Sequence, residues 1–291
     1  MLPPFEYHQP ASLEEALDLL SSLPGQKKVL AGGTDLVPAL RRGDLNPAHV
    51  VSLKQLAEMK KIEIENDSVR IGALVTFSEL AESALAEGPY SLVAGAARQV
   101  GGPQIRNQGT VGGNIVNASP AGDLLPPLLA LEARVRLCRR GGERVLPLEQ
   151  LLAGMGKTCL DPEEILAEVI FPTLPEKAGS SFVKLGRRNS LAISRISMAV
   201  VLLRYAGGCI DEARLALGAV ASRPIRVPLA EALLKGRHPG PLLLEEAIAA
   251  VAETAAASLG SRASAPYKRM AVRGVAREAL IKADPAFVGA D

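Results

Sequence analysis

The sequence of 291 residues has no tryptophan, and only 3% of its residues are aromatic. A chain this poor in aromatic rings lacks the stacking surfaces on which proteins bind single-stranded nucleic acids. Its charge is balanced as well, because 33 basic residues stand against 31 acidic ones, for a net charge of +2. Nucleic-acid binding needs a strongly basic surface, so we expect no nucleic-acid partner.

Cysteine and histidine are equally scarce. The three cysteines lie far apart without a CxxC pair, which argues against disulfides, a zinc ribbon or an iron–sulfur cluster carried by this chain alone (Cys138, Cys159 and Cys209). The three histidines are also dispersed, and we expect surface or capping positions for them rather than a catalytic triad (His8, His49 and His238). We therefore predict no metal ligands on this chain.

Long uncharged hydrophobic runs are absent too, and none reaches the ~18 residues of a membrane-spanning helix. The first ten residues, MLPPFEYHQP, have no basic stretch followed by an apolar one, as a secretion signal would. We expect a cytoplasmic protein without a membrane segment. With 48% hydrophobic residues, a chain of this length suits one large domain or two medium ones.

The common mononucleotide-binding patterns are missing: no segment reads GxxxxGK[ST], and no GxGxxG lies at a strand-to-helix junction. Adjacent acids occur at residues 14–15 and 163–164, where we expect first helical turns and a favourable interaction with the helix dipole. The sequence therefore gives little sign of a nucleophile, and we predict no catalytic residue.

Small and polar residues instead gather in the segment RNQGTVGGNIVNASPAGD, residues 106–123. Glycines let backbone N–H groups approach a ligand closely, and successive N–H groups in such turns form an anion-binding nest. We interpret the segment as loop, short strand and loop, followed by a helix over residues 124–131. A second glycine pair lies in AGGTD, residues 31–35. Two nests predict a ligand with two phosphates; the alternative for each is a glycine-rich surface loop.

The first part of the chain alternates helix and strand signals. Capping boxes at residues 12–15 and 76–79 predict helices behind them, and a third helix is expected over residues 90–100. A strand at residues 28–31 leads through the glycine pair and a short helical turn to a strand at residues 50–53, which makes a β–α–β unit. Residues 69–71 predict a further strand.

From residue 134 onward, alternating apolar residues predict antiparallel strands. A hairpin around Gly141 and Gly142 joins two strands at residues 134–146, and residues 165–171 form another. The segment at residues 172–179, rich in proline, glycine and charge, marks a domain boundary. Behind it we predict three strands and then three helices, the strands at residues 181–187, 198–205 and 210–220 and the helices at residues 228–234, 242–259 and 266–283.

Four blocks of this sequence resemble one protein family. They are AGGTDL at residues 31–36, IRNQGTVGGNIVNASPAGDLLPPLLAL at residues 105–131, DPEEILAEVIFP at residues 161–172 and FVKLGRR at residues 182–188. In this order they are similar to the FAD-binding medium subunit of molybdenum hydroxylases, the enzymes of the xanthine dehydrogenase and carbon monoxide dehydrogenase type. The resemblance spans essentially the whole chain, and its long second block is highly specific.

The resemblance implies an α+β fold with two domains. Residues 1–176 would form an FAD-binding domain of the vanillyl-alcohol-oxidase (PCMH) type, with two α/β subdomains at about residues 1–55 and 56–176, and residues 177–291 a C-terminal domain with a three-stranded antiparallel sheet plus helices. One pyrophosphate loop would consist of Val29, Leu30, Ala31, Gly32, Gly33, Thr34, Asp35 and Leu36. The other would consist of Thr110, Val111, Gly112, Gly113 and Asn114.

The same resemblance implies further FAD contacts. Asp123 would hold a hydroxyl of the sugar or ribityl chain, and Val100 would line the adenine or flavin. Leu166 would lie at the isoalloxazine, by packing or through its backbone, and Lys184 would donate to the pyrimidine edge. Leu191 would cover the flavin face. Relatives commonly carry an acid after the arginine pair, and its absence here puts in doubt an NAD site of the xanthine dehydrogenase kind.

The implied function is that of an oxidoreductase subunit. It would bind FAD non-covalently and pass electrons from [2Fe-2S] clusters of a partner chain to an external acceptor. The implied partners are a small iron–sulfur subunit and a large subunit with the molybdenum cofactor, in a dimer of heterotrimers. The substrate and the final acceptor (NAD, oxygen, quinone or other) stay open. The rival hypotheses are a self-sufficient FAD-dependent oxidoreductase with its own substrate pocket and a cofactor-free assembly protein.

Overall fold

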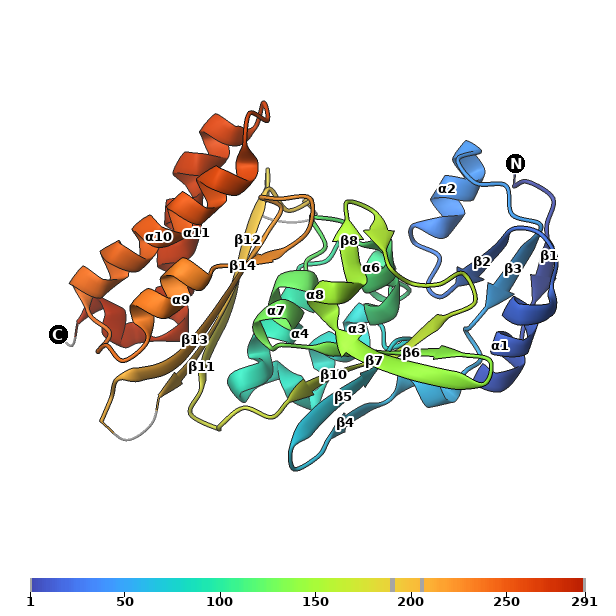
Figure 1. Ribbon diagram of the computed structural model, residues 1–291, viewed down its shortest axis with the longest axis horizontal. Coiled ribbons are helices and arrows are strands. Elements are labelled where there is room, and N and C mark those ends of the chain that lie inside the picture. Colours follow the sequence, from blue (N-terminus) through green and yellow to red (C-terminus); the bar gives the residue numbers. More distant parts are fainter. Residues whose placement is uncertain (1, 189–191, 205–206, 290–291) are drawn as a thin grey trace. The chain divides into compact units, whose positions relative to one another are not determined.

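The computed structural model describes residues 2–188, 192–204 and 207–289. They form two compact units, each built from segments far apart in the sequence (Figure 1). Unit 1 comprises Met1–Glu79, Gly102–Ala118 and Ala133–Thr173, and unit 2 comprises Leu80–Gly101, Ser119–Glu132 and Leu174–Asp291. Two segments that precede the expected domain boundary therefore pack with the C-terminal part of the chain.

A three-stranded parallel sheet of order β1-β3-β2 forms one part of unit 1. Its strands β2 (Lys27–Leu30) and β3 (His49–Ser52) are joined through α2 (Leu36–Arg42), which confirms the predicted β–α–β unit. The edge strand β1 (Glu6–His8) was not predicted, because three residues are too few for a periodic signal. Helix α1 (Leu13–Ser22) begins at Ser12, whose hydroxyl accepts from the Glu15 N–H as the capping box predicts.

A five-stranded antiparallel sheet forms the other part of unit 1. Its order is β4-β5-β10-β6-β7, with β4 at Ile62–Ile64, β5 at Ser68–Gly72, β10 at Ile165–Pro172, β6 at Arg134–Arg139 and β7 at Gly142–Pro147. The predicted hairpin and the antiparallel pairing are confirmed. Shorter elements complete this unit: η1 (Ala57–Lys60), α5 (Pro103–Arg106), α6 (Val111–Asn117), α8 (Leu148–Leu151), β8 (Leu152–Gly154) and β9 (Lys157–Thr158).

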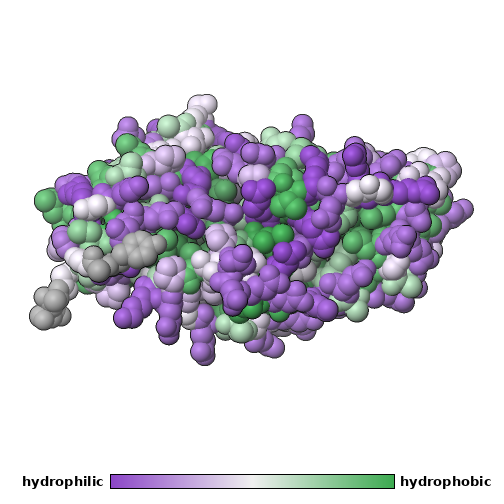
Figure 2. Space-filling model, turned by 60° about the horizontal axis from the view of Figure 1, so that its bottom comes forward, coloured by the Kyte–Doolittle hydropathy of each residue, from purple (hydrophilic) through white to green (hydrophobic). Residues whose placement is uncertain are grey.

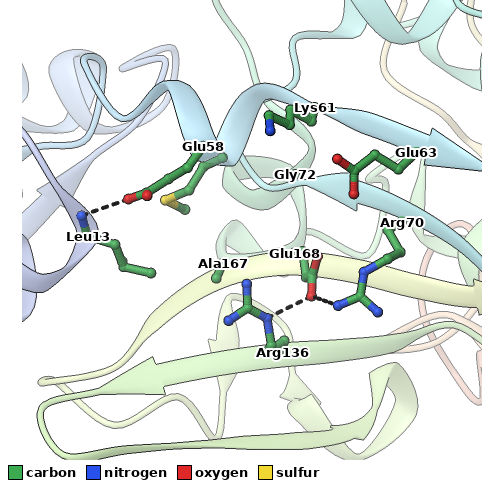
Figure 3. A pocket seen from close by; sticks show the side chains of 10 residues that line it. Leu13, Glu58, Lys61, Glu63, Arg70, Gly72, Arg136, Ala167 and Glu168 are labelled. Carbon is green, nitrogen blue, oxygen red and sulfur yellow. Dashed lines mark hydrogen bonds and ion pairs between the residues drawn. The ribbon is translucent and has the colours of Figure 1, made fainter.

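One polar cavity of 420 Å³ lies on this antiparallel sheet (Figure 3). At its floor, Oε1 of Glu168 lies 2.7 Å from Nε of Arg136 and 2.5 Å from an Nη of Arg70, so one carboxylate joins three strands. The remaining charged residues of the lining, Glu58, Lys61 and Glu63, add two acids and one base. Acids and bases are therefore balanced around this cavity, which gives it no net attraction for an anion.

The acids at residues 163–164 do not begin a helix, so that expectation is wrong. Glu164 lies in a turn before β10, where its carboxylate accepts from Nε of Arg144 at 2.7 Å and from the backbone N–H of Asp161 at 2.9 Å. The hydrogen bond from Arg144 lowers the pKa of Glu164 while burial opposes it. The partner of Glu164 is thus an arginine 20 positions earlier in the chain. The residues next to Glu164 in the sequence give no sign of this pairing. The pair at residues 14–15 does lie in the first turn of α1.

Unit 2 contains a four-stranded antiparallel sheet where three strands were expected. Its order is β11-β12-β13-β14, with β11 at Gly179–Leu185, β12 at Ile196–Arg204, β13 at Ile210–Gly218 and β14 at Ile225–Arg226. The fourth strand escaped prediction because two residues show no alternation. The predicted helices at the end of the chain are confirmed as α9 (Pro228–Leu234), α10 (Pro241–Leu259) and α11 (Ala265–Ala283).

The sheet of unit 2 is covered on both faces (Figure 1). Alternate residues of β12, Met198, Val200 and Leu202, are buried in one core with α10 and α11. The opposite face meets α4 (Ser91–Arg98) and α7 (Leu125–Ala130), so closely that a Cβ on Gly218 would lie 2.8 Å from Pro126. This unit also contains η2 (Ala84–Ala86), η3 (Gly88–Tyr90) and η4 (Pro285–Val288), and α3 (Phe77–Glu82) crosses from unit 1 into it.

Hydrophilic residues cover most of the face in Figure 2, with hydrophobic residues in smaller groups among them. Across the described residues, no helix combines the length and the low polarity needed to cross a membrane.

Candidate functional site

The two glycine segments meet in unit 1 through direct backbone contact. A Cβ added to Gly32 would lie 1.8 Å from the carbonyl oxygen of Gln108 and 3.0 Å from Cα of Gly109. Two side-chain hydrogen bonds join the same region, one from Asn117 Nδ2 to Asp35 Oδ1 and one from Lys54 Nζ to the Gln108 side chain, each 3.3 Å long. Only glycine allows this approach at position 32.

The first segment presents a row of open backbone donors. Gly33 has φ of +78°, a conformation that glycine adopts without strain, and the chain then enters α2. Among the described residues, no acceptor is bonded to the backbone N–H groups of residues 31–35. Successive free N–H groups around a left-handed glycine form an anion-binding concavity. The open N–H groups and the left-handed Gly33 are compatible with the predicted nest, which stays a prediction.

The second segment differs from the prediction, because residues 111–117 form helix α6 instead of a short strand. Thr110 caps this helix, with its Oγ1 3.0 Å from the N–H of Gly113. Val111 and Ile115 are both fully buried, and their spacing of four places them on one helical face. The apolar spacing had been interpreted as strand alternation, and the glycines obscured the helix.

The backbone donors of α6 are already used within the protein. The N–H of Val111 donates to the carbonyl of Val75 at 2.9 Å, and the N–H of Gly112 donates to that of Ala73 at 2.8 Å. A Cβ on Gly112 would lie 2.6 Å from Cβ of Ala73, so this glycine serves close packing. Oδ1 of Asn114 is buried and has no hydrogen-bond partner among the residues that the structure describes. A buried acceptor of this kind calls for a donor such as a ligand hydroxyl.

Unit 2 holds a buried charged cluster around Asp123. Its Oδ2 lies 2.6 Å from Nζ of Lys184 and its Oδ1 lies 2.5 Å from Oγ of Ser194. The ammonium also donates to the carbonyl of Gln99 at 2.8 Å, beside Val100. Burial raises the pKa of Asp123, while the charge and hydrogen bond of Lys184 and the hydroxyl of Ser194 counteract that rise.

This cluster provides the buried ammonium of Lys184 with a partner of opposite charge within the protein. Its partner is Asp123, 61 positions earlier in the chain, and both side chains are less than a tenth exposed. Ser194 was missed altogether, because a serine near an apolar strand carries no signal until the fold places it against a carboxylate. Asp123, Lys184 and Val100 are thus brought together in unit 2.

The remaining expected contacts are distributed as follows. Val29 and Leu30 belong to β2, and Thr34, Asp35 and Leu36 follow at the start of α2. Leu166 is a buried residue of β10, only 4% exposed, at an irregularity of its pairing with β6. Leu191 lies outside the described residues.

The expected surface or capping position is wrong for His49, which is buried at 7% exposure. The parallel pairing of β1 with β3 brings His8 Nε2 to 3.2 Å from His49 Nδ1. His238 was expected at a surface or capping position and lies with its Nε2 3.2 Å from Sγ of Cys209. In both cases the distances in sequence, 41 and 29 positions, hid the contact.

The profile described as FAD binding domain in molybdopterin dehydrogenase matches residues 3–174, and that described as CO dehydrogenase flavoprotein C-terminal domain matches residues 181–283. The chain belongs to the FAD-binding medium-subunit family of molybdenum hydroxylases. The resemblance noted in the sequence is thereby confirmed.

Individual relatives of this family match nearly end to end. The xanthine dehydrogenase FAD-binding subunit of Escherichia coli O157:H7 is 33% identical over 97% of each chain. The nicotinate dehydrogenase FAD-subunit of Eubacterium barkeri is 32% identical over 95% of each chain. A solved carbon monoxide dehydrogenase from Hydrogenophaga pseudoflava, lacking the Mo-pyranopterin moiety of its cofactor, is 31% identical with a TM-score of 0.89, covering 97% of this chain and 98% of that chain.

The backbone contact at Gly32 predicts a strong effect of a single methyl group. Gly32→Ala should lower the free energy of unfolding by about 3–5 kcal/mol, the upper end for point mutations, because backbone atoms must separate. Urea denaturation followed by circular dichroism measures the change. The matched control is Gly142→Ala, where no atom lies within 4 Å of the added Cβ, and it should stay within about 0.5 kcal/mol of the parent chain. Equal stabilities of the two variants would refute the contact.

The buried pair in unit 2 predicts a pH-dependent loss of stability. Lys184→Met leaves burial as the main influence on Asp123, so the pKa of this carboxyl rises further in the fold. A folded pKa above the unfolded value of about 3.9 makes stability fall as pH rises. Urea titrations should show a loss of about 3–5 kcal/mol at pH 8 and a smaller loss at pH 5.

The control for this variant is Lys282→Met, which removes an exposed ion pair with Glu278. It should cost less than about 1 kcal/mol at either pH. If Lys184→Met lowers the free energy of unfolding by the same amount at pH 5 and pH 8, Asp123 does not titrate as described.

Proposed function

We propose that this chain is the FAD-binding electron-transfer subunit of a molybdenum hydroxylase complex. The observation that carries the proposal is the row of free N–H donors at residues 31–35, in a chain that belongs to a family of FAD-binding subunits. A pyrophosphate fits these donors, because successive backbone N–H groups can donate hydrogen bonds to its anionic oxygens. The buried, unpartnered Oδ1 of Asn114 fits a cofactor hydroxyl.

We assign the cofactor-binding roles as follows. Residues 29–36 hold the pyrophosphate through their backbone. Thr110, Val111, Gly112 and Gly113 act mainly by bringing α6 against the first segment, since three of their N–H groups are bonded within the protein. Asn114 offers the open acceptor. This arrangement modifies the expectation of two equivalent phosphate loops.

The residues of unit 2 take a second role. Asp123 and Lys184 fix each other's positions, and each retains hydrogen-bonding capacity beyond the contacts described. We assign Asp123 to a cofactor hydroxyl, and Lys184 to the pyrimidine edge of the flavin. Val100, Leu166 and Leu191 complete the proposed contacts as apolar residues. The domain division at residues 176–177 and the vanillyl-alcohol-oxidase type of the first domain are part of this proposal.

When bound, FAD supplies the redox chemistry, accepting electrons and passing them on. The chain itself binds and orients the cofactor. Among the relatives, one is named the medium chain of a carbon monoxide dehydrogenase and another the medium subunit of a nicotine 6-hydroxylase. We propose corresponding partners here: a small subunit with [2Fe-2S] clusters and a large subunit with the molybdenum cofactor, in a dimer of heterotrimers.

Flavin content tests the proposal directly. The purified chain, incubated with FAD and desalted, should retain about one flavin per chain and absorb in the blue. Acid precipitation should release all of this flavin into the supernatant, because no covalent bond holds it. A chain that stays colourless after incubation would contradict the proposal, and flavin retained in the acid pellet would contradict non-covalent binding.

A further inference from the structure

The parallel sheet of unit 1 places three metal-binding side chains together. In the register of β1 and β3, Glu6 lies opposite His49. His8 follows Glu6 by two residues, and residues two apart on a strand project from the same face. Glu6, His8 and His49 therefore form one cluster on one face of two adjacent strands, which we call the His8–His49 cluster.

The distances within this cluster match those between ligands of one metal ion. His8 Nε2 is 3.2 Å from His49 Nδ1, and Oε2 of Glu6 is 3.3 Å from that same nitrogen. The third edge, from Glu6 Oε2 to His8 Nε2, is 3.9 Å. Ligand atoms bound at ~2.0–2.2 Å in tetrahedral geometry lie about 3.3–3.6 Å apart. A small rotation of the exposed Glu6 side chain closes the longest edge.

The exposure of the cluster resembles an anchored but open site. The side chains of His49 and His8 are 9% and 21% exposed, so the fold fixes both rings, whereas Glu6 is 73% exposed. Three protein ligands leave at least one coordination position to water. Two imidazoles and one carboxylate suit zinc and similar transition metals, while magnesium and calcium prefer all-oxygen sites.

We propose that Glu6, His8 and His49 bind one divalent transition-metal ion, with Zn²⁺ as the probe. The ion would cross-link β1, a three-residue edge strand, to the buried strand β3. Such a bridge stabilises β1, which within its sheet is paired with β3 alone. The site is separate from the proposed flavin function, because none of its residues belongs to the glycine segments or the Asp123 cluster.

Zinc titration of the full chain tests this site. Cys209→Ser serves as the background, since Cys209 and His238 form another pair able to bind a metal. After removal of metals with EDTA, isothermal titration should detect one Zn²⁺ per chain. His8→Asn and His49→Asn, each in this background, should weaken the zinc affinity at least about tenfold. Losing a ligand should cost no less than losing a residue that only hydrogen-bonds to a ligand. His238→Asn should leave it unchanged.

A second readout separates ligation from folding. Co²⁺ in the site should give the visible bands of an imidazole-bound ion, and Glu6→Gln, a change at an exposed position, should alter these bands while metal-free circular dichroism and melting temperature stay the same. Zinc should raise the melting temperature of the background chain and not that of the histidine variants. Equal zinc affinity in background and histidine variants, or no zinc binding at all, would overturn the proposal and leave a hydrogen bond between the two rings.

Discussion

The contact of Gly32 with the backbone of Gln108 and Gly109 is the constraint on which the candidate site depends. Two segments more than 70 positions apart can touch there only because Gly32 has no Cβ, which would lie 1.8 Å from the carbonyl oxygen of Gln108. The contact fixes the end of β2 against the loop that precedes α6, and no acceptor in the described part of the chain bonds to the N–H groups of residues 31–35. Residues 31–34 are half-buried and Asp35 is exposed, so water can bond to these N–H groups until a ligand takes its place. Packing and binding are thus properties of the same glycines.

The glycines of the two segments have two different roles, although they look alike in the sequence. Gly33 has a left-handed backbone and belongs to the open donor row. Gly112 instead permits close packing of α6 on Ala73, with its own N–H already bonded. The distinction matters for the cofactor, because affinity for phosphate comes from free donors. In unit 2, the buried side chains of Asp123 and Lys184 are likewise bonded within the protein, because they form an ion pair without a ligand.

Sequence reasoning succeeded where the signal is local. The β–α–β unit, the hairpin at Gly141 and Gly142, and α9 depend on neighbouring residues and were predicted. It failed where register or distant pairing decides: α6 was taken for a strand, Glu164 was given a helical role, and the buried His49 was expected at the surface or at a cap. The glycine segments were found by composition and the family by motif, but which donors stay free depends on Ala73 and Val75, residues that no motif contains.

Hydrogen–deuterium exchange of the chain with and without FAD tests the central claim, that the free donors of residues 31–35 bind the cofactor. Amides already bonded within the fold, such as Gly112, exchange slowly in both states, whereas unpaired amides gain protection only when a ligand accepts from them. We predict strong FAD-dependent protection in peptides covering residues 30–37, and none at the hairpin around Gly141. FAD bound at about one per chain without protection of residues 30–37 would contradict the account.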